Sequence, residues 1–382
     1  MKSYRQEIAR RLDASPSSIH LYWKGRVALY AALQAAGIGA GDEVIVPALT
    51  CVAVPNAILY CRATPIYADV RADTLTLDPA SVMSVVTSRT RALIIQNTFG
   101  LSADVDSLVA FAHSRNITAI EDCTHGFGGR FNDRPNGTLA DAAFFSTQWN
   151  KPYSTGIGGF LVVNRRELFP ALDLVNRARI PAAPAELASL WLSLQLRRLL
   201  LHDATYWRLL RLYRRLSRAG LVTGSSSAQE IDSIDMPPGF LKNHSRVQAA
   251  AGCDGLKYLN QALEKRRHAA HAFRRVLAAH GKWHVGPGHD ANHAWLKFPL
   301  LGCDGKARQA LIAAAERARI RICDWFMSPI HPVDRGFEQW RLDPGTVPTA
   351  HAISRKLLTL DTEVAHPHRV CDFIEKHRSL LE

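Results

Sequence analysis

Two spacings of hydrophobic residues alternate along the first half of the chain. The segment 26–36 carries apolar residues at i, i+3 and i+4, which predicts a helix that ends at Gly37 and Gly39. The other predicted helices are 55–59, one that begins at Asp78-Pro79, and 104–114; short apolar runs predict buried strands at 44–46, 65–68, 93–95, 117–120, 142–145 and 160–163. Strands of this kind that alternate with helices indicate a mostly parallel sheet covered on both faces.

The alternation stops at about residue 165. A proline-rich linker at 180–184 precedes a long Leu/Arg segment, and helical spacing resumes at 247–279, 306–318 and 370–381, with a strand-like piece near 295–298. We therefore predict an α/β fold in two parts. The large domain spans 1–240 and includes an atypical Leu/Arg-rich helical insertion at 165–240, and a smaller α+β domain spans 241–382.

The composition is that of a globular protein with a sizeable core. Because 47% of the residues are hydrophobic and 21% are charged, an intrinsically disordered chain is excluded. No apolar run is long enough to cross a bilayer, and the polar N-terminus does not resemble a signal peptide, so we expect a cytoplasmic protein. The seven cysteines are scattered without a CxxC pair, which favours reduced thiols over a disulfide framework or a zinc ribbon.

The formal net charge of the chain is +13, and one segment holds a local excess of positive charge. Between Arg197 and Arg218 there are seven arginines and one acid, Asp203, and on a helix Arg208, Arg211 and Arg215 would lie opposite Tyr206 and Leu209. Such a basic amphipathic helix either packs on its own domain or its dimer mate, or docks on an anionic membrane or a lipid-linked pyrophosphate through 190–218.

Other classes of ligand receive little support from the sequence. No P-loop motif occurs and the basic face of the helix lacks interleaved aromatic residues, so a nucleic-acid partner is not expected. His268 and His271 share a helical face, and His366 lies close to His368, but no carboxylate or cysteine completes either pair at metal-ligand spacing. We therefore predict no metal site.

Four features with chemical potential fall where predicted strands end or helices begin. Gly25-Arg26 opens the first helix, Asp122 and Ser146 each end a strand, and Lys151 precedes the glycine-rich turn at 156–159. In a parallel sheet these positions face the ligand crevice. A lysine, an acid, a hydroxyl and a helix N-terminus together suit an aldehyde that carries a phosphate and a ring nitrogen, namely pyridoxal 5'-phosphate (PLP).

The order of these features resembles the DegT/DnrJ/EryC1/StrS family of sugar aminotransferases, which are fold type I PLP enzymes. The resemblance covers about residues 25–164 and returns over the last 140 residues. It rests on six blocks in the same order as in the family, including GRVALYAALQAAGIGAGDEVIVP, TPIYADVRADTLTLDP, TFGLSADVD, AIEDCTHGFGG and STQWNKPYSTGIGGFLVVN. The family implies a fold type I architecture, with a mostly parallel sheet in the large domain.

The resemblance also implies a role for each candidate residue. Lys151 would bind PLP covalently and then move a proton during the reaction. Asp122 would pair with the pyridine nitrogen and keep it protonated. Ser146 and the first turn of the helix, at Gly25 and the N–H groups of Arg26 and Val27, would hold the phosphate.

The sequence departs from the family at three of these positions. His125 stands where a glutamine usually reaches the phenolic oxygen of the cofactor, and it would bring a titratable charge beside the ring. Cys51 replaces an aromatic residue that commonly stacks on the ring, so that Tyr22, Trp23 or another segment would have to supply it. The asparagine that reaches the phosphate from the second subunit has no direct counterpart, and Asn243 is the nearest candidate.

From this resemblance we expect a homodimeric aminotransferase. The resemblance implies L-glutamate as the donor and, as the acceptor, a keto-sugar linked to a nucleotide. A sugar 3-dehydratase is disfavoured, because those relatives carry a histidine in place of Lys151. Two alternatives stay open: an acceptor that is a cyclitol or another non-sugar or lipid-linked ketone, and a PLP-binding protein that does not catalyse and docks through its basic helix.

Overall fold

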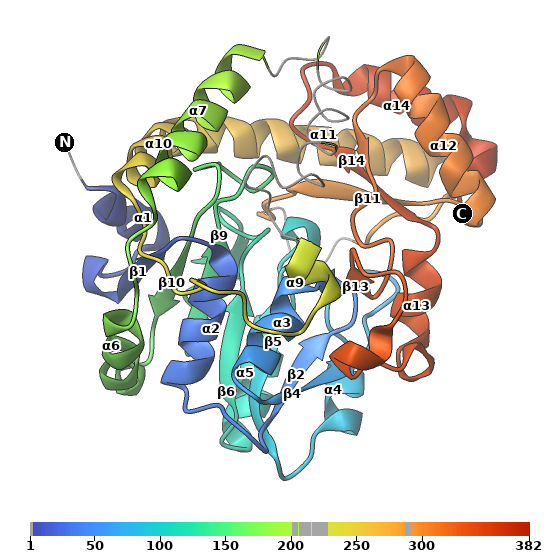
Figure 1. The fold of residues 1–382 in the computed structure, drawn as a ribbon. Coiled ribbons are helices and arrows are strands. Elements are labelled where there is room, and N and C mark those ends of the chain that lie inside the picture. The colour runs from blue at the N-terminus through green and yellow to red at the C-terminus, as the bar shows by residue number, and fades with distance from the viewer. Residues whose placement is uncertain (1–2, 201–204, 206–214, 216–227, 287–291) are drawn as a thin grey trace.

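The computed structural model describes residues 3–200, 205, 215, 228–286 and 292–382. A large α/β part carries the first half of the chain, and a smaller part with α11, α12 and α14 lies above it in Figure 1. The helices are α1 (Tyr4–Leu12), α2 (Gly25–Ala35), α3 (Ala53–Tyr60), α4 (Pro79–Val85), α5 (Val105–Ser114), α6 (Phe169–Arg177), α7 (Pro184–Leu200), α9 (Ala228–Asp232), α10 (Arg246–Lys257), α11 (Leu259–Ala279), α12 (Gly305–Ala318), α13 (Pro348–Ser354) and α14 (Pro367–Lys376).

In the part of the chain that the structure describes, the strands form one large sheet and three small ones. They are β1 (Ile19–Tyr22), β2 (Glu43–Pro47), β3 (Thr50–Cys51), β4 (Thr64–Ala68), β5 (Thr90–Gln96), β6 (Thr118–Asp122), β7 (Arg130–Phe131), β8 (Arg134–Pro135), β9 (Ala142–Ser146), β10 (Gly159–Val163), β11 (Lys297–Leu301), β12 (Ile322–Cys323), β13 (Ile330–His331) and β14 (Leu357–Asp361). The large sheet has the order β1-β10-β9-β6-β5-β2-β4. Its five strands from β9 to β4 are parallel, whereas β10 is antiparallel to both β9 and β1. The predicted mostly parallel sheet is confirmed.

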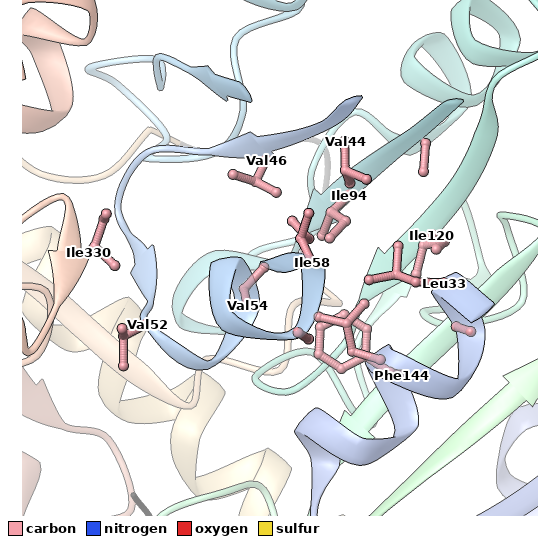
Figure 2. Packing of buried hydrophobic residues seen from close by; sticks show 14 of the residues in the cluster. Leu33, Val44, Val46, Val52, Val54, Ile58, Ile94, Ile120, Phe144 and Ile330 are labelled. Atoms are coloured by element: carbon pink, nitrogen blue, oxygen red, sulfur yellow. The ribbon is translucent and has the colours of Figure 1, made fainter. Parts of the chain in front are cut away.

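Hydrophobic residues cover both faces of this sheet. On one face, Val44, Ile94, Ile120 and Phe144 pack against Leu33 of α2, as Figure 2 shows. Neighbouring residues on the same strands point the other way, and form a second cluster with α4 and α5. That cluster includes Ile45, Leu93, Ile95, Ala119, Val82, Val105 and Leu108. The two-fold side-chain alternation of each strand therefore buries both faces, which is why the strands are nearly all apolar.

The smaller part is built on the antiparallel sheet β11-β14-β12. Its core includes Phe273 of α11, Phe298 of β11, Leu360 of β14 and Phe373 of α14. The predicted helical stretch 247–279 is divided into α10 and α11 at Tyr258. A parallel pairing of β13 with β3 joins this half of the chain to the large sheet region. The predicted domain boundary at residue 240 stays a prediction.

Helix α1 and strand β1 were not expected from the sequence. Helix α1 begins with a capping box in which the Ser3 hydroxyl accepts from Gln6 N–H, and it buries Tyr4, Ile8 and Leu12. The predicted Leu/Arg-rich region begins as α7, but the predicted basic face from Tyr206 to Arg218 lies outside the described residues apart from Arg215. Among the helices that the structure describes, none is long and apolar enough to span a membrane. All seven cysteines are free thiols, as predicted.

Candidate active site

Lys151 lies in a short closed loop between β9 and β10. The loop is closed at its base by Thr147 and Thr155: the Thr155 N–H donates to the Thr147 carbonyl at 2.7 Å, and the two hydroxyls are 2.6 Å apart. Arg266 of α11 donates to the carbonyl of Pro152 at 2.9 Å, which holds the residue next to Lys151. Hydrogen bonds therefore fix the loop that carries Lys151 at two points, at its base and at the residue after the lysine.

The surroundings of Lys151 change its acidity. Burial lowers the pKa of its amine to about 8, with opposing contributions from Cys51 and Asp122, and lowering contributions from Arg26 and Lys297. Burial has this effect because a charged ammonium loses its hydration in the protein interior. The structure thus brings Lys151 close to two of the predicted site residues, Asp122 and Arg26, and to two further groups, Cys51 and Lys297.

Asp122 is the last residue of β6 and is almost fully buried. Its carboxylate accepts a hydrogen bond from the Thr124 N–H at 2.9 Å. Burial raises the pKa of Asp122, while the Thr124 hydrogen bonds and Lys151 act in the opposite direction. A buried carboxylate that faces a lysine at the carboxyl end of a parallel strand can pair with a cationic group of a bound ligand.

His125 is held by its backbone surroundings in one orientation. The Phe99 N–H donates to its Nδ1 at 3.2 Å, which leaves Nε2 to carry the proton in the neutral ring. Burial, together with Lys151 and Lys297, lowers the pKa of His125 well below its usual value. The titratable charge expected from the sequence is therefore suppressed, and His125 is a neutral hydrogen-bond donor, as a glutamine amide would be.

The aromatic ring at this site comes from Trp325, which the sequence did not single out. Its indole stacks on His125 with centroids 5.1 Å apart and an interplanar angle of 19°. The Lys151 Nζ lies 5.2 Å from the centroid of the same ring. The two aromatic candidates named from the sequence are used elsewhere. Tyr22 donates to the Asn176 side chain and packs under Arg179, and Trp23 joins a cluster with Leu190 of α7.

The N-terminus of α2 approaches β9 and β10 very closely at Gly25. A Cβ added to Gly25 would lie 2.9 Å from the Cβ of Ser146, the last residue of β9. A Cβ added to Gly159 of β10 would overlap the Gly25 Cα. The first turn is tight, since Val27 N–H donates to the Lys24 carbonyl at 3.2 Å. Only glycines permit this approach, which places the positive end of the α2 dipole beside Ser146.

An acidic side chain already occupies part of this helix terminus. Glu230 of α9 is buried, and its carboxylate lies 2.6 Å from the Arg26 guanidinium and 3.5 Å from the Lys24 ammonium. The Glu230 carbonyl accepts from Asn56 at 2.7 Å. Because Glu230 engages the Arg26 side chain, Arg26 would act on a phosphate chiefly through its backbone amide.

Asn243 and Cys51 belong to different elements of the fold. The Asn243 backbone bridges to Tyr22, and its N–H donates to the Ile180 carbonyl at 2.8 Å, so it flanks the strand that leads into α2. Its predicted role toward a partner subunit stays a prediction. Cys51 is half-buried on β3, opposite His331 of β13, and places a thiol where the family has an aromatic ring.

These donors fit PLP group by group. Lys151 supplies an amine for the aldehyde, Asp122 a carboxylate for the ring nitrogen, and His125 a neutral N–H for the phenolic oxygen. The close contact of Gly25 with Ser146 places a helix N-terminus beside this serine, and backbone N–H groups at a helix N-terminus suit a phosphate. No group of three or more metal-ligating side chains is found in the described part of the chain.

Comparison with known proteins identifies the family and the fold to which these residues belong. Residues 23–179 and 202–370 match the DegT/DnrJ/EryC1/StrS aminotransferase family. Spr1654 from Streptococcus pneumoniae in its PLP form has the same fold, with a TM-score of 0.71 at 20% identity over 100% of this chain and 91% of that chain. The fold is therefore that of the fold type I PLP-dependent transferases.

Curated relatives match over a shorter stretch. The chain is 41% identical to GDP-perosamine synthase of Escherichia coli O157:H7 over 145 residues, which is 38% of this chain and 40% of that protein. It is 38% identical to L-glutamine:2-deoxy-scyllo-inosose aminotransferase of Micromonospora echinospora over 164 residues, which is 41% of this chain and 39% of that protein. The matched stretch thus spans only about two fifths of either relative.

Proposed function

The chain belongs to the DegT/DnrJ/EryC1/StrS aminotransferase family, and on that premise we propose that it is a PLP-dependent aminotransferase. It would move an amino group from an amino acid to the keto group of a sugar or a cyclitol. The observation that carries the proposal is the meeting of Lys151, Asp122 and His125 at the carboxyl end of the parallel sheet, where Lys151 and His125 contact the same Trp325 ring and Lys151 acts on the Asp122 carboxylate.

The cofactor supplies one kind of chemistry when bound: its ring withdraws electrons from the carbon attached to the transferred nitrogen. The chain's residues do the rest. Asp122 would hold a proton on the ring nitrogen, His125 would donate its Nε2–H to the ring oxygen, and Ser146 with the first turn of α2 would hold the phosphate. Trp325, from the second half of the chain, stacks on His125 at this site.

Lys151 has two tasks in this proposal. As a neutral amine it would be the nucleophile that binds the aldehyde, and its Nζ would then accept and return the proton that moves during the transfer. The pKa of about 8 suits both tasks, because a proton carrier works best when its pKa lies near the operating pH. The closed loop from Thr147 to Thr155 keeps the amine in place during the transfer.

The donor and the acceptor are proposals of finer detail. L-glutamate is the donor expected from the sequence, whereas the Micromonospora relative is named for L-glutamine, so both are candidates. The acceptor is proposed to be a keto-sugar linked to a nucleotide, on the likeness to GDP-perosamine synthase. The likeness to the inosose aminotransferase of Micromonospora echinospora supports the alternative acceptor that the sequence left open, a free cyclitol ketone. A homodimer, with Asn243 reaching the partner subunit, likewise stays a prediction.

An absorption spectrum of the purified protein tests the proposal. After reconstitution with PLP, we expect a visible band that shifts when L-glutamate or L-glutamine is added, because the donor half-reaction changes the form of the cofactor. Lys151→Ala should lack the lysine-bound band. Lys257→Ala is the matched control, because Lys257 is an exposed lysine paired with Asp254 and lies outside the site.

The outcomes separate the remaining candidates. A band that ignores both donors would support the alternative of a non-catalytic PLP-binding protein. Absence of any band after reconstitution would overturn the cofactor assignment. When one donor does react, amino transfer to a nucleotide-linked keto-sugar and to a free inosose can then be compared by mass spectrometry of the products.

A further inference from the structure

A buried glutamine in the first turn of α10 contacts two segments of the active site. Gln248 is 0% exposed. Its Nε2 donates to the carbonyl of Ile157 at 2.7 Å and to the carbonyl of Trp23 at 3.0 Å. Its Oε1 accepts from the N–H and the hydroxyl of Ser245 at 2.8 and 3.0 Å. Both protons of the amide nitrogen and both lone pairs of the amide oxygen are therefore used.

These partners fix the direction in which the Gln248 amide points. A backbone carbonyl can only accept and a backbone N–H can only donate, so the amide nitrogen must face Trp23 and Ile157 while the oxygen faces Ser245. The contacts with Ser245 form a capping box at the start of α10. A glutamate would complete the same capping box, but its carboxylate could not donate to two carbonyls. The cap therefore explains only half of what this side chain does.

Each of the two carbonyls belongs to a segment that carries part of the site. Trp23 lies two residues ahead of Gly25, with which α2 begins. Ile157 lies in the glycine-rich segment between Lys151 and β10. The side chain of Gln248 thus connects the start of the helix that would hold a phosphate with the loop that carries the lysine.

The surroundings make these two hydrogen bonds costly to lose. Trp23 and Ile157 are 3% and 2% exposed and belong to one apolar cluster. Gly158 leaves room for the amide, because a Cβ added to this glycine would lie 3.5 Å from Gln248 Nε2. A buried carbonyl that loses its donor is destabilising, since no water replaces the lost partner. Gln248 therefore holds the two segments at a fixed separation.

This separation matters if both segments bind one rigid ligand. Under the proposed function, on which the inference rests, the cofactor carries its phosphate and its aldehyde on one aromatic ring. A phosphate anchored at α2 then determines where the aldehyde lies. We propose that Gln248 is a positioning residue that holds the Lys151 amine at the aldehyde of a cofactor anchored at α2. It acts through the backbone of the two segments rather than by contact with cofactor or substrate.

The variant Q248E tests the two donated hydrogen bonds and keeps the cap, because glutamate completes a capping box as glutamine does. Q6E is the matched control, because Gln6 completes the equivalent capping box with Ser3 at the start of α1 and is exposed. Q248M adds no buried charge and is the second variant if Q248E does not fold, with Q6M as its control.

Three quantities are measured for each variant. Hydrogen exchange of the protein without cofactor is followed by mass spectrometry in peptides that cover 20–27 and 153–160. The absorption spectrum after addition of PLP gives the share of bound PLP that is attached to Lys151. Steady-state kinetics give kcat and the donor KM separately.

We expect Q248E to exchange faster than wild type in both peptides. The ratio of lysine-bound to unattached PLP and kcat should each fall by about 10-fold, because two buried hydrogen bonds are lost. The donor KM should stay unchanged, and Q6E should match wild type in every measurement.

Unchanged hydrogen exchange in Q248E would overturn the proposal. A lower melting temperature with a wild-type share of lysine-bound PLP would also overturn it, because Gln248 would then stabilise the fold without positioning the lysine. If the wild-type protein binds no PLP, the proposed function fails, and the exchange of the two peptides still shows whether Gln248 holds them together.

Discussion

The acidity of Lys151 sets when its amine can react. With a pKa of about 8, roughly one amine in ten is neutral at pH 7. At the ordinary lysine value of 10.5 the neutral fraction would be about one in three thousand. Only the neutral amine is nucleophilic. Burial therefore raises the fraction of Lys151 that can react at pH 7 by more than a hundredfold, which is the ratio of the two neutral fractions.

Lys151 should therefore have its own pH profile of covalent labelling. The folded protein is exposed to PLP at pH 6 to 10, the product is trapped with borohydride, and each lysine is quantified by peptide mass spectrometry. We expect labelling of Lys151 to rise through about pH 8 and then level off. Lys257 is the internal control, because its hydrogen bond to Asp254 raises its pKa and its labelling should still rise at pH 10. Parallel profiles for the two lysines would contradict the assigned acidity of Lys151.

The sequence identified some site residues and not others, for physical reasons. Lys151 and Asp122 were found because each follows a buried strand, and chemistry gathers at such strand ends. Lys297 was missed because it begins an apolar strand and is an isolated cation in the sequence. Trp325 was missed because its segment has no helical or strand periodicity, and only tertiary folding brings it onto His125.

The junction of α2 with β9 and β10 depends on two facing glycines. Gly25 and Gly159 face each other with no room for a side chain, and Gly25 also abuts the Ser146 Cβ. The contacts at Gly159 are all with backbone atoms, which cannot move aside as a flexible side chain would. The closeness of α2 to the sheet is what brings the helix N-terminus into the site, so fold and phosphate binding depend on the same contact.

Gly159→Ala should therefore damage both stability and the site. The added methyl group would overlap the Gly25 backbone, and overpacking of this kind costs about 1–3 kcal/mol in the free energy of unfolding. We expect urea denaturation to show that loss, together with weaker PLP binding as α2 is pushed from Ser146. Gly39→Ala is the control, because nothing lies within 4 Å of its added Cβ, and its effect should stay within about 0.5 kcal/mol. Equal stability of the two variants would show that α2 can shift freely.

Helices and strands could be predicted where the spacing of their hydrophobic residues was clear. They were missed where the element was short, or where the spacing continued from one helix into the next. The central strands and α2, α3 and α5 follow from apolar runs and stripes. Strand β1 has only four residues and lies at the edge of the sheet, where burial is partial. The buried apolar residues keep nearly the same helical spacing across the break between α10 and α11 at Tyr258. The sequence pattern therefore predicted a single helix.

At the scale of the molecule, the site is assembled from both parts of the chain. Arg266 holds the Lys151 loop, Trp325 stacks on His125, and β13 pairs with β3 beside Cys51. Each of these contacts joins residues more than a hundred positions apart. The sequence places the large-domain residues of the site, but it cannot show which side of the small domain closes over them, because no local pattern encodes that orientation.

Helix α7 has an exposed apolar stripe on its outer face, as far as the described residues show. Its inner face buries Leu190 and Leu194 against Trp23 and Ile157. The outer face carries Trp191 at 55%, Leu192 at 51% and Leu199 at 73% exposure. Exposed apolar groups at i, i+1 and i+8 lie on one side of a helix, and such a stripe favours contact with another surface.

The charge of the molecule favours an anionic membrane as that surface, because a protein of net charge +13 is drawn to acidic headgroups while apolar residues enter the interface. We predict that the protein co-sediments with vesicles containing phosphatidylserine at low salt, and is released as salt screens the attraction. The double variant W191E/L199E should lose vesicle binding and keep its melting temperature, because both side chains are exposed. Neutral vesicles are the control for charge. Light scattering on the same variant measures its oligomeric state. A change from dimer to monomer would assign the stripe to subunit contact instead, and so would absence of binding of the wild-type protein to acidic vesicles at low salt.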